Sequence, residues 1–242
     1  MYAAASVSDM LAQQALYDQR RRWLHRWLTC AAYWLVRVQV FHAERVPQQD
    51  GAILMMNHIT WIDPALLTLV VRHRYVISMA KHETRHNPPV ALVNRLWGNI
   101  LVRRGEPDRV ALNAAIELLR AKQLIMIAPE GTRNKQGLGV GRDGLAYVAC
   151  KANALVVPSA VVGVHDWRER WRRLRRLQAQ IHFGRPFRFV LGQDERLNKE
   201  TRAAMTREAM YQLALAIPDE FAQYRGCYSD VENASTHYLA FA

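Results

Sequence analysis

Apolar runs of strand length alternate with helix-length segments through most of the chain. Short runs rich in β-branched and aliphatic residues predict strands at 36–41, 52–56, 75–79, 100–102, 124–128, 155–162 and 180–183. Apolar residues spaced three or four apart predict helices at 64–71, 89–96, 107–121, 144–151 and 199–217. This alternation predicts an α/β fold with a mostly parallel sheet flanked by helices. We expect residues 37–190 to form the core and residues 191–242 to add a C-terminal helix and tail packed on it.

Residues 1–36 carry a separate, amphipathic pattern. On a helical wheel Trp23, Trp27 and Trp34 fall on one face, and arginines gather beside it. Tryptophan beside arginine is typical of a helix at a membrane interface, so we expect this N-terminal segment to be helical and membrane-associating. The alternative is that the tryptophan face covers the core. The apolar stretch 28–36 is much shorter than the roughly 20 residues that span a bilayer, so no transmembrane helix is expected.

The net charge of +12 restricts the class of partner. A basic surface attracts polyanions, but no zinc finger, aromatic–basic RNA motif or long basic tail accompanies the charge. We therefore expect an anionic membrane surface as a partner and no nucleic acid. The segment 166–177 adds a predicted helix with tryptophans on one side and, on the other, Arg168, Arg172, Arg175 and Arg176. It is either a solvated charged helix or a cationic edge for lipid headgroups or donor phosphates.

Cysteine usage and the N-terminus bear on the compartment. The three cysteines, Cys30, Cys150 and Cys227, are widely spaced and form no C-x-x-C pair, which favours a reducing compartment over a disulfide framework. Residues 1–18 lack a basic start, and no apolar run is followed by a small-residue cleavage pattern, so no secretory signal is predicted. We expect a cytoplasmic protein that binds peripherally to the inner face of the cytoplasmic membrane.

Two short polar motifs follow predicted strands. Residues 57–64 read N-H-I-T-W-I-D-P, and residues 129–133 read P-E-G-T-R. In the first motif Asp63 is close enough to His58 to orient the imidazole and stabilise its charged form, which is how a hydroxyl-activating base is built. The second motif places Arg133, an anion-binding side chain, near the flexible Gly131. Together the motifs suggest a base that meets a phosphate-bearing alcohol.

The H-x4-D motif followed by P-E-G-T-R resembles the glycerolipid acyltransferase family typified by bacterial 1-acylglycerol-3-phosphate O-acyltransferase. Two weaker blocks of that family follow the expected order, G-N-I-L-V-R-R at 98–104 and V-P-S-A at 157–160. The resemblance covers roughly residues 35–190. It implies a glycerol-3-phosphate acyltransferase-like fold with His58 and Asp63 as the catalytic pair. It also implies a set of substrate-binding residues, namely Asn57, Arg104, Glu130, Gly131, Thr132 and Arg133.

The reaction implied by the resemblance is an O-acyl transfer in phospholipid biosynthesis or remodelling. His58 takes the proton of a glycerol-backbone hydroxyl as it attacks a thioester, while Arg104 and Arg133 hold the acceptor's phosphate. The acceptor is 1-acylglycerol-3-phosphate or a related lysophospholipid, and the donor is acyl-CoA or acyl carrier protein. We expect no metal and no prosthetic group, since the acyl carrier is a co-substrate. Glu130 either orients the substrate or anchors the loop that carries Arg133.

Three other classes of function match parts of the sequence: a silent lipid-binding protein, a zinc protease and a serine hydrolase. A catalytically silent lipid- or membrane-binding protein on the same scaffold would release no thiol in response to lysolipid. Residues 82–86 read H-E-T-R-H, a zinc-protease pattern, but Asn87 precedes a proline and is biased away from helix, so the long helix of a zinc protease cannot continue. A serine hydrolase could also use His58 and Asp63, yet the chain has no G-x-S-x-G elbow.

Overall fold

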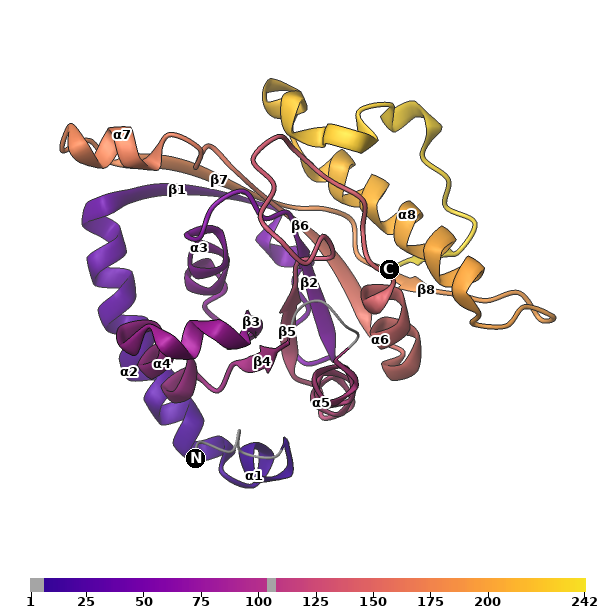
Figure 1. The fold of residues 1–242 in the computed structure, drawn as a ribbon, viewed down its shortest axis with the longest axis horizontal. Coiled ribbons are helices and arrows are strands. Elements are labelled where there is room, and N and C mark those ends of the chain that lie inside the picture. The colour runs from indigo at the N-terminus through magenta and orange to yellow at the C-terminus, as the bar shows by residue number, and fades with distance from the viewer. Residues whose placement is uncertain (1–6, 104–107) are drawn as a thin grey trace.

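The fold is built on one mixed sheet whose strands come from the whole length of the chain (Figure 1). The computed structural model describes residues 7–103 and 108–242. Within these residues nine strands form the sheet: β1 Val36–Phe41, β2 Ala52–Met56, β3 Val76–Lys81, β4 Ile100–Val102, β5 Leu124–Ile127, β6 Leu155–Val162, β7 Leu177–Phe183, β8 Phe187–Phe189 and β9 Leu239–Phe241.

The sheet is parallel in its centre and antiparallel at one side. Its order is β1-β7-β6-β2-β5-β3-β4, with β8 paired to β6 and β9 to β8. Strand β2 runs parallel to both β5 and β6, and β3 runs parallel to β4 and β5. Every residue of β2 and β6 is buried, as expected for strands covered on both faces. The predicted α/β fold with a mostly parallel sheet is confirmed.

Helices cover both faces of this sheet. The described α-helices are α1 Val7–Ala12, α2 Gln14–Leu35, α3 Asp63–Val70, α4 Pro88–Trp97, α5 Arg109–Arg120, α6 Gly144–Ala152, α7 Trp167–Arg172 and α8 Lys199–Ala216. Short 3-10 helices add η1 Ala43–Arg45, η2 His82–His86, η3 Asp219–Tyr228 and η4 Val231–Asn233. Helices α2, α3 and α4 lie on one side of the sheet, and α5, α6 and α8 lie on the other (Figure 1).

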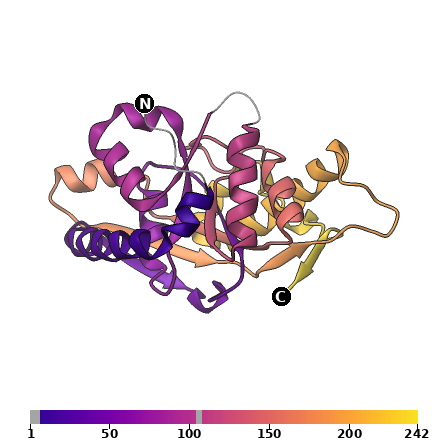
Figure 2. The ribbon, with the colours of Figure 1, turned by 90° about the horizontal axis from the view of Figure 1, so that it is seen from below.

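Helix α2 packs on the core through Arg21, Leu24 and His25 rather than through its tryptophans. The buried Arg21 guanidinium donates to the Trp97 carbonyl at 2.7 Å, and His25 Nε2 donates to the Leu69 carbonyl at 3.1 Å. Both Trp23 and Trp27 are about 60% exposed. The helix lies at the opposite end of the molecule from α8 in both views (Figures 1 and 2). Among the described helices none is long and apolar enough to cross a membrane.

The C-terminal half differs from the sequence prediction at the end of α7 and at two short strands. The helix predicted at 166–177 ends at Arg172, because Leu174 adopts a left-handed φ of 52° that an α-helix cannot contain, and β7 begins at Leu177. Strands β8 and β9 were not predicted, and they are only three residues each.

The start predicted for α5 at residue 107 lies outside the described residues. The helix begins at Arg109, where the carboxylate of Asp108 caps the Ala111 N–H at 3.1 Å.

Candidate functional site

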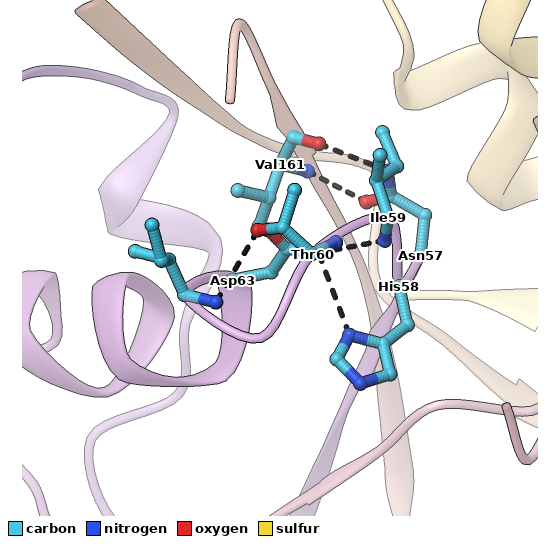
Figure 3. A network of polar contacts seen from close by, with 7 residues as sticks. Asn57, His58, Ile59, Thr60, Asp63 and Val161 are labelled. Carbon is cyan, nitrogen blue, oxygen red and sulfur yellow. Dashed lines mark hydrogen bonds and ion pairs between the residues drawn. The ribbon is translucent and has the colours of Figure 1, made fainter. Parts of the chain in front are cut away.

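His58 lies in the turn that joins β2 to α3, beside a fully buried carboxylate. Asp63 Oδ2 is 3.4 Å from His58 Nδ1 (Figure 3). The same oxygen accepts the backbone N–H groups of Ile59 and Thr60, each at 2.7 Å, and Asp63 Oδ1 accepts the Thr60 hydroxyl. Three donors therefore fix Asp63 independently of the imidazole. Because a carboxylate only accepts, Nδ1 of His58 must carry the proton, which leaves Nε2 able to take one.

Asn57 fixes the end of β2 against the longer β6. Its Nδ2 donates to the Val161 carbonyl at 2.9 Å, and its Oδ1 accepts the Val161 N–H at 2.7 Å (Figure 3). The side chain thus replaces a strand partner where β2 has ended, and it sets the point at which His58 leaves the sheet. Both polar atoms of Asn57 are engaged in this way, so its predicted contact with substrate stays a prediction.

The second motif follows β5 and turns back past His58. Gly131 has a φ of 68°, a conformation that favours glycine, and its N–H donates to the Ala128 carbonyl at 3.0 Å. The chain then brings the Asn134 N–H to 2.7 Å from the His58 carbonyl. The two motifs therefore meet, and the turn at Gly131 makes the meeting possible.

Glu130, in the second motif, is buried and makes a hydrogen bond to the loop that follows the motif. Its buried carboxylate accepts the Gly139 N–H at 2.8 Å. Burial raises the pKa of Glu130, and hydrogen bonds from the backbone of Gly139 and His58 and from the side chain of Asn134 oppose that rise. The Asn134 N–H, directly after the motif, also donates to the His58 carbonyl, so the second motif and the residue that follows it contact the backbone of His58. These contacts support an anchoring role for Glu130.

A cleft of about 1030 Å³ opens at this edge of the sheet. It lies at the carboxyl ends of β2, β3 and β5 and at the amino ends of α5 and α6, which is where ligands usually bind in open α/β sheets. His58 and Gly131 both line it, together with an apolar wall that includes Met79, Val102, Leu112, Ile127 and Leu145. The cleft thus combines a candidate base with room for an apolar chain.

Comparison with known proteins places this arrangement in a family. The family model described as Acyltransferase matches residues 37–162, just over half of the chain. The chain belongs to the acyltransferase family. This membership agrees with the resemblance carried by the two motifs, both of which lie inside the matched range.

Individual acyltransferases show the same likeness. The chain is 30% identical over 139 residues to the 1-acyl-sn-glycerol-3-phosphate acyltransferase of Borreliella burgdorferi, an overlap of 55% of each chain. It is 25% identical over 136 residues to the protein of that name from Bacillus subtilis, covering 56% of this chain and 68% of that one. The chain thus spans about half the length of the Borreliella relative.

A solved acyltransferase structure confirms the fold. The crystal structure of the 1-acyl-sn-glycerophosphate acyltransferase from Thermotoga maritima matches with a TM-score of 0.59 and 20% sequence identity. The match covers 82% of this chain and 78% of that one, so it extends well beyond the two motifs. At this identity the likeness shows the fold alone.

The acyltransferase cleft is strongly basic. Five cationic side chains line it: Lys81, Arg103, Arg109, Arg142 and Arg202. Two carboxylates also line it, Asp108 and Asp143, and the first of them is occupied by the N–H groups of Arg103 and Ala111. Lys81 is paired with Glu83 at 3.5 Å. The remaining excess of positive charge suits an anionic ligand.

The predicted site residues are only partly brought together. His58 and Gly131 line the cleft, and Asp63 and Glu130 lie directly behind them. Thr132 and Arg133 are exposed and do not line it. Arg104 lies outside the described residues, while its neighbour Arg103 lines the cleft. Arg142 was not singled out in the sequence, although its place near the second motif could have drawn attention to it.

A contact from the C-terminal region to the loop after the second motif was also missed. The Leu138 N–H donates to the Tyr224 carbonyl, and the Cys227 N–H donates to the Leu138 carbonyl, both at 2.9 Å. Gly226 lies between those two residues with a φ of 51°, and a Cβ there would sit 2.3 Å from the Leu138 oxygen. No signal in the sequence pairs residues so far apart. The C-terminal segment therefore supports the loop that follows the candidate site.

The H-E-T-R-H segment has no zinc-protease geometry. Residues His82–His86 form the 3-10 helix η2, and α4 begins at Pro88 after the capping residue Asn87. A 3-10 turn has three residues, so the two histidines do not share a face as they would one α-helical turn apart. Within residues 7–103 and 108–242, no three histidine, cysteine or acidic side chains cluster as a metal site would need.

Proposed function

We propose that this chain is an O-acyltransferase that moves a fatty acyl group from a thioester to the free hydroxyl of 1-acylglycerol-3-phosphate or a related lysophospholipid. The observation that carries this proposal is the hydrogen-bonded pair of His58 and Asp63 at the end of a large basic cleft. The names of the relatives from Borreliella and Bacillus, 1-acyl-sn-glycerol-3-phosphate acyltransferase, support the choice of acceptor.

The reaction proceeds by direct transfer with His58 as general base. Nε2 of His58 takes the proton of the acceptor hydroxyl while that oxygen attacks the thioester carbonyl carbon. The tetrahedral intermediate then collapses, the carbon–sulfur bond breaks, and the imidazolium returns the proton to the leaving thiolate. Asp63 stabilises the imidazolium through Nδ1. The carboxylate needs no rearrangement to do this, because the N–H groups of Ile59 and Thr60 already hold it.

Stabilisation of the developing oxyanion is assigned to the turn after Gly131. The Gly131 N–H is already used by the Ala128 carbonyl. Directly after the cleft-lining Gly131, the N–H groups of Thr132 and Arg133 have no acceptor among the described residues, and these groups at the edge of the cleft are the donors we propose. The remaining predicted substrate contacts, through Arg104, the Arg133 side chain and Asn57, stay part of the proposal.

The donor is a thioester of CoA or of acyl carrier protein, and no resident metal or prosthetic group takes part. The apolar wall of the cleft suits the acyl chain, since each buried methylene contributes about 0.8 kcal/mol. The direct test is thiol release by the purified full chain, measured with lysophosphatidic acid present and absent, across CoA and carrier-protein donors of several chain lengths. Lysolipid-dependent release with stoichiometric diacyl product supports the proposal, and its absence with every donor contradicts it.

We also propose that the enzyme binds peripherally to an anionic membrane, the inner face of the cytoplasmic membrane. The exposed aromatic face of α2 supports this, with Trp34 74% exposed, and α7 extends it at the same end of the molecule (Figure 1). Trp171 Nε1 donates to the Leu35 carbonyl at 3.2 Å, and Leu174 is almost fully exposed at the tip after α7. Arginines of α7 and its following turn flank these aromatic groups, as anionic headgroups require.

Tryptophan contacts connect this surface to the catalytic turn. Trp61, three residues after His58, packs edge-on against Trp167 with ring centres 5.5 Å apart. Trp167 in turn packs against Trp171 at 5.1 Å. The catalytic turn therefore lies next to the proposed membrane surface, where a lysolipid acceptor resides.

The second candidate function is a catalytically silent lipid-binding protein on the same scaffold. Such a protein would bind vesicles and lysolipid equally well but release no thiol from any donor. The intact geometry of His58 and Asp63 favours the enzyme, because a binding protein has no need of a hydrogen-bonded base in its cleft.

A further inference from the structure

Arg142 lines the cleft and lies against the glycine of the second motif. Its N–H donates to the Pro129 carbonyl at 2.9 Å, which fixes its backbone beside the end of β5. A Cβ placed on Gly131 would lie 3.0 Å from Arg142 Nε and 3.2 Å from its Cδ. The side chain thus lies directly over Gly131, where a Cβ would contact it closely.

The guanidinium of Arg142 has no polar partner in the described part of the chain. No carboxylate or carbonyl among the described residues accepts a hydrogen bond from it, and no ion pair includes it. The side chain is exposed to the cleft, which His58 and Gly131 also line. A guanidinium with five N–H donors and no partner among the described residues, in the cleft that also holds the candidate base, is equipped to bind an oxyanion such as phosphate.

Arg133, which the sequence favoured for this task, is placed differently. It is exposed but does not line the cleft, and the chain directly after it is held against the His58 carbonyl through Asn134. Arg142 comes nine positions later in the sequence, but the loop returns it to the turn at Gly131. The arginine of the motif and the arginine that lines the cleft are therefore two different residues.

We propose that Arg142 is a substrate-binding residue that holds a phosphate of the reactants through its guanidinium. The proposal rests on the proposed acyl transfer and specifies how its site recognises charge. A phosphate can come from two sources in this reaction, the headgroup of the acceptor lysolipid or the carrier part of the thioester donor. The chemistry recognised is the same in both cases, and the substrates used in the test distinguish the sources.

The test uses the full chain with Arg142→Gln, Arg142→Lys and, as a matched control, Arg196→Gln. Arg196 is an exposed arginine in the segment between β8 and α8, and it does not line the cleft. Each protein is assayed with two acceptors, lysophosphatidic acid and monoacylglycerol. Each acceptor is combined with two donors, acyl-CoA and the acyl thioester of N-acetylcysteamine, which carries no phosphate. Circular dichroism confirms that each variant is folded.

The expected result is a selective loss. Arg142→Gln should lower kcat/KM about 10- to 150-fold for combinations that contain the contacted phosphate, the range for a hydrogen bond to a charged group. A loss confined to lysophosphatidic acid identifies the acceptor phosphate, and one confined to acyl-CoA identifies the donor. Arg142→Lys should recover part of the rate, because an ammonium keeps the charge but loses the planar fork. Arg196→Gln should match the wild type.

Two results would overturn the proposal. One is an equal loss for all four substrate combinations, which would assign Arg142 to support of the fold. The other is no loss in any combination. A binding measurement distinguishes failure of this proposal from failure of the proposed acyl transfer. Glycerol 3-phosphate and free CoA are titrated calorimetrically into the wild-type protein and into Arg142→Gln. Weaker binding of either by the variant supports the proposal even in the absence of turnover, and equal binding of both contradicts it.

Discussion

Replacing His58 and Asp63 one at a time separates catalysis from folding, because their structural roles differ. Among the described residues the His58 side chain makes one hydrogen bond, to Asp63, and it is 13% exposed. In His58→Ala, Asp63 keeps the Ile59 and Thr60 N–H groups and the Thr60 hydroxyl as donors. We expect a change in the free energy of unfolding of about 1 kcal/mol or less. Turnover should fall about 10²- to 10⁴-fold or more, since the general base is removed.

Asp63→Asn should lower both the free energy of unfolding and the turnover. The amide oxygen can still accept the N–H groups of Ile59 and Thr60, but its NH2 group then faces the Thr60 hydroxyl. Charge-assisted bonds become neutral ones, so we expect a loss of stability of about 1–3 kcal/mol. For a chain of this size that corresponds to a fall in Tm of roughly 2–4 °C per kcal/mol. Turnover should fall as far as in His58→Ala, because the neutral amide does not stabilise the imidazolium.

The assay is thiol release from long-chain acyl-CoA in the presence of lysophosphatidic acid, with thermal unfolding followed in parallel. A folded His58→Ala protein that keeps more than about a tenth of wild-type turnover would refute the general-base mechanism. An Asp63→Asn protein with wild-type Tm would refute the stability argument, since it would mean that the hydrogen bonds around the carboxylate contribute little.

Three further changes probe the rest of the molecule. Replacing Trp23, Trp27 and Trp34 with serine should weaken binding to anionic vesicles in a sedimentation assay, because these exposed rings form the proposed membrane face. Glu130→Gln should change the pH dependence of stability. Burial raises the pKa of Glu130 above 4.5, so the native state binds the extra proton, and wild-type stability should fall as pH rises from 4.5 through the native pKa. Chemical unfolding should show that the stability of Glu130→Gln does not fall in this way as the pH rises. Gly226→Ala should lower stability by about 1–3 kcal/mol and reduce turnover, because a Cβ meets the Leu138 oxygen at a positive φ.

For each of these three predictions, one result would contradict it. Equal vesicle binding by the triple tryptophan variant would restrict α2 to packing. An unchanged pH profile in Glu130→Gln would mean that the carboxyl is not the group that titrates. For Gly226 the matched control is Gly192→Ala, where φ is not positive and the new Cβ meets only the flexible side chain of Glu195 at 3.4 Å. Equal stability of the two glycine variants would show that the C-terminal contact does not support the loop.

The elements around the site could be predicted because their local patterns are strong. The boundaries of β1, β2, β4 and β6 agree with the apolar runs, since runs of β-branched and aliphatic residues carry their own strand signal. Strands β8 and β9 were missed because three residues are too few to establish a period, and β9 exists only through its pairing with β8. The end of α7 was misplaced because the arginines continue a helical spacing that the left-handed Leu174 interrupts.

The sequence by itself determined the pair of His58 and Asp63, since both lie in one turn and local geometry is enough to bring them together. It also determined the family, through motifs that are read in order along the chain. Only the tertiary structure decided which residues surround the base. Arg142 reaches the cleft and Arg133 does not, because the loop after Gly131 is folded back by contacts with His58, Glu130 and the distant C-terminal segment. Such contacts join residues far apart in the chain, and no local pattern encodes them.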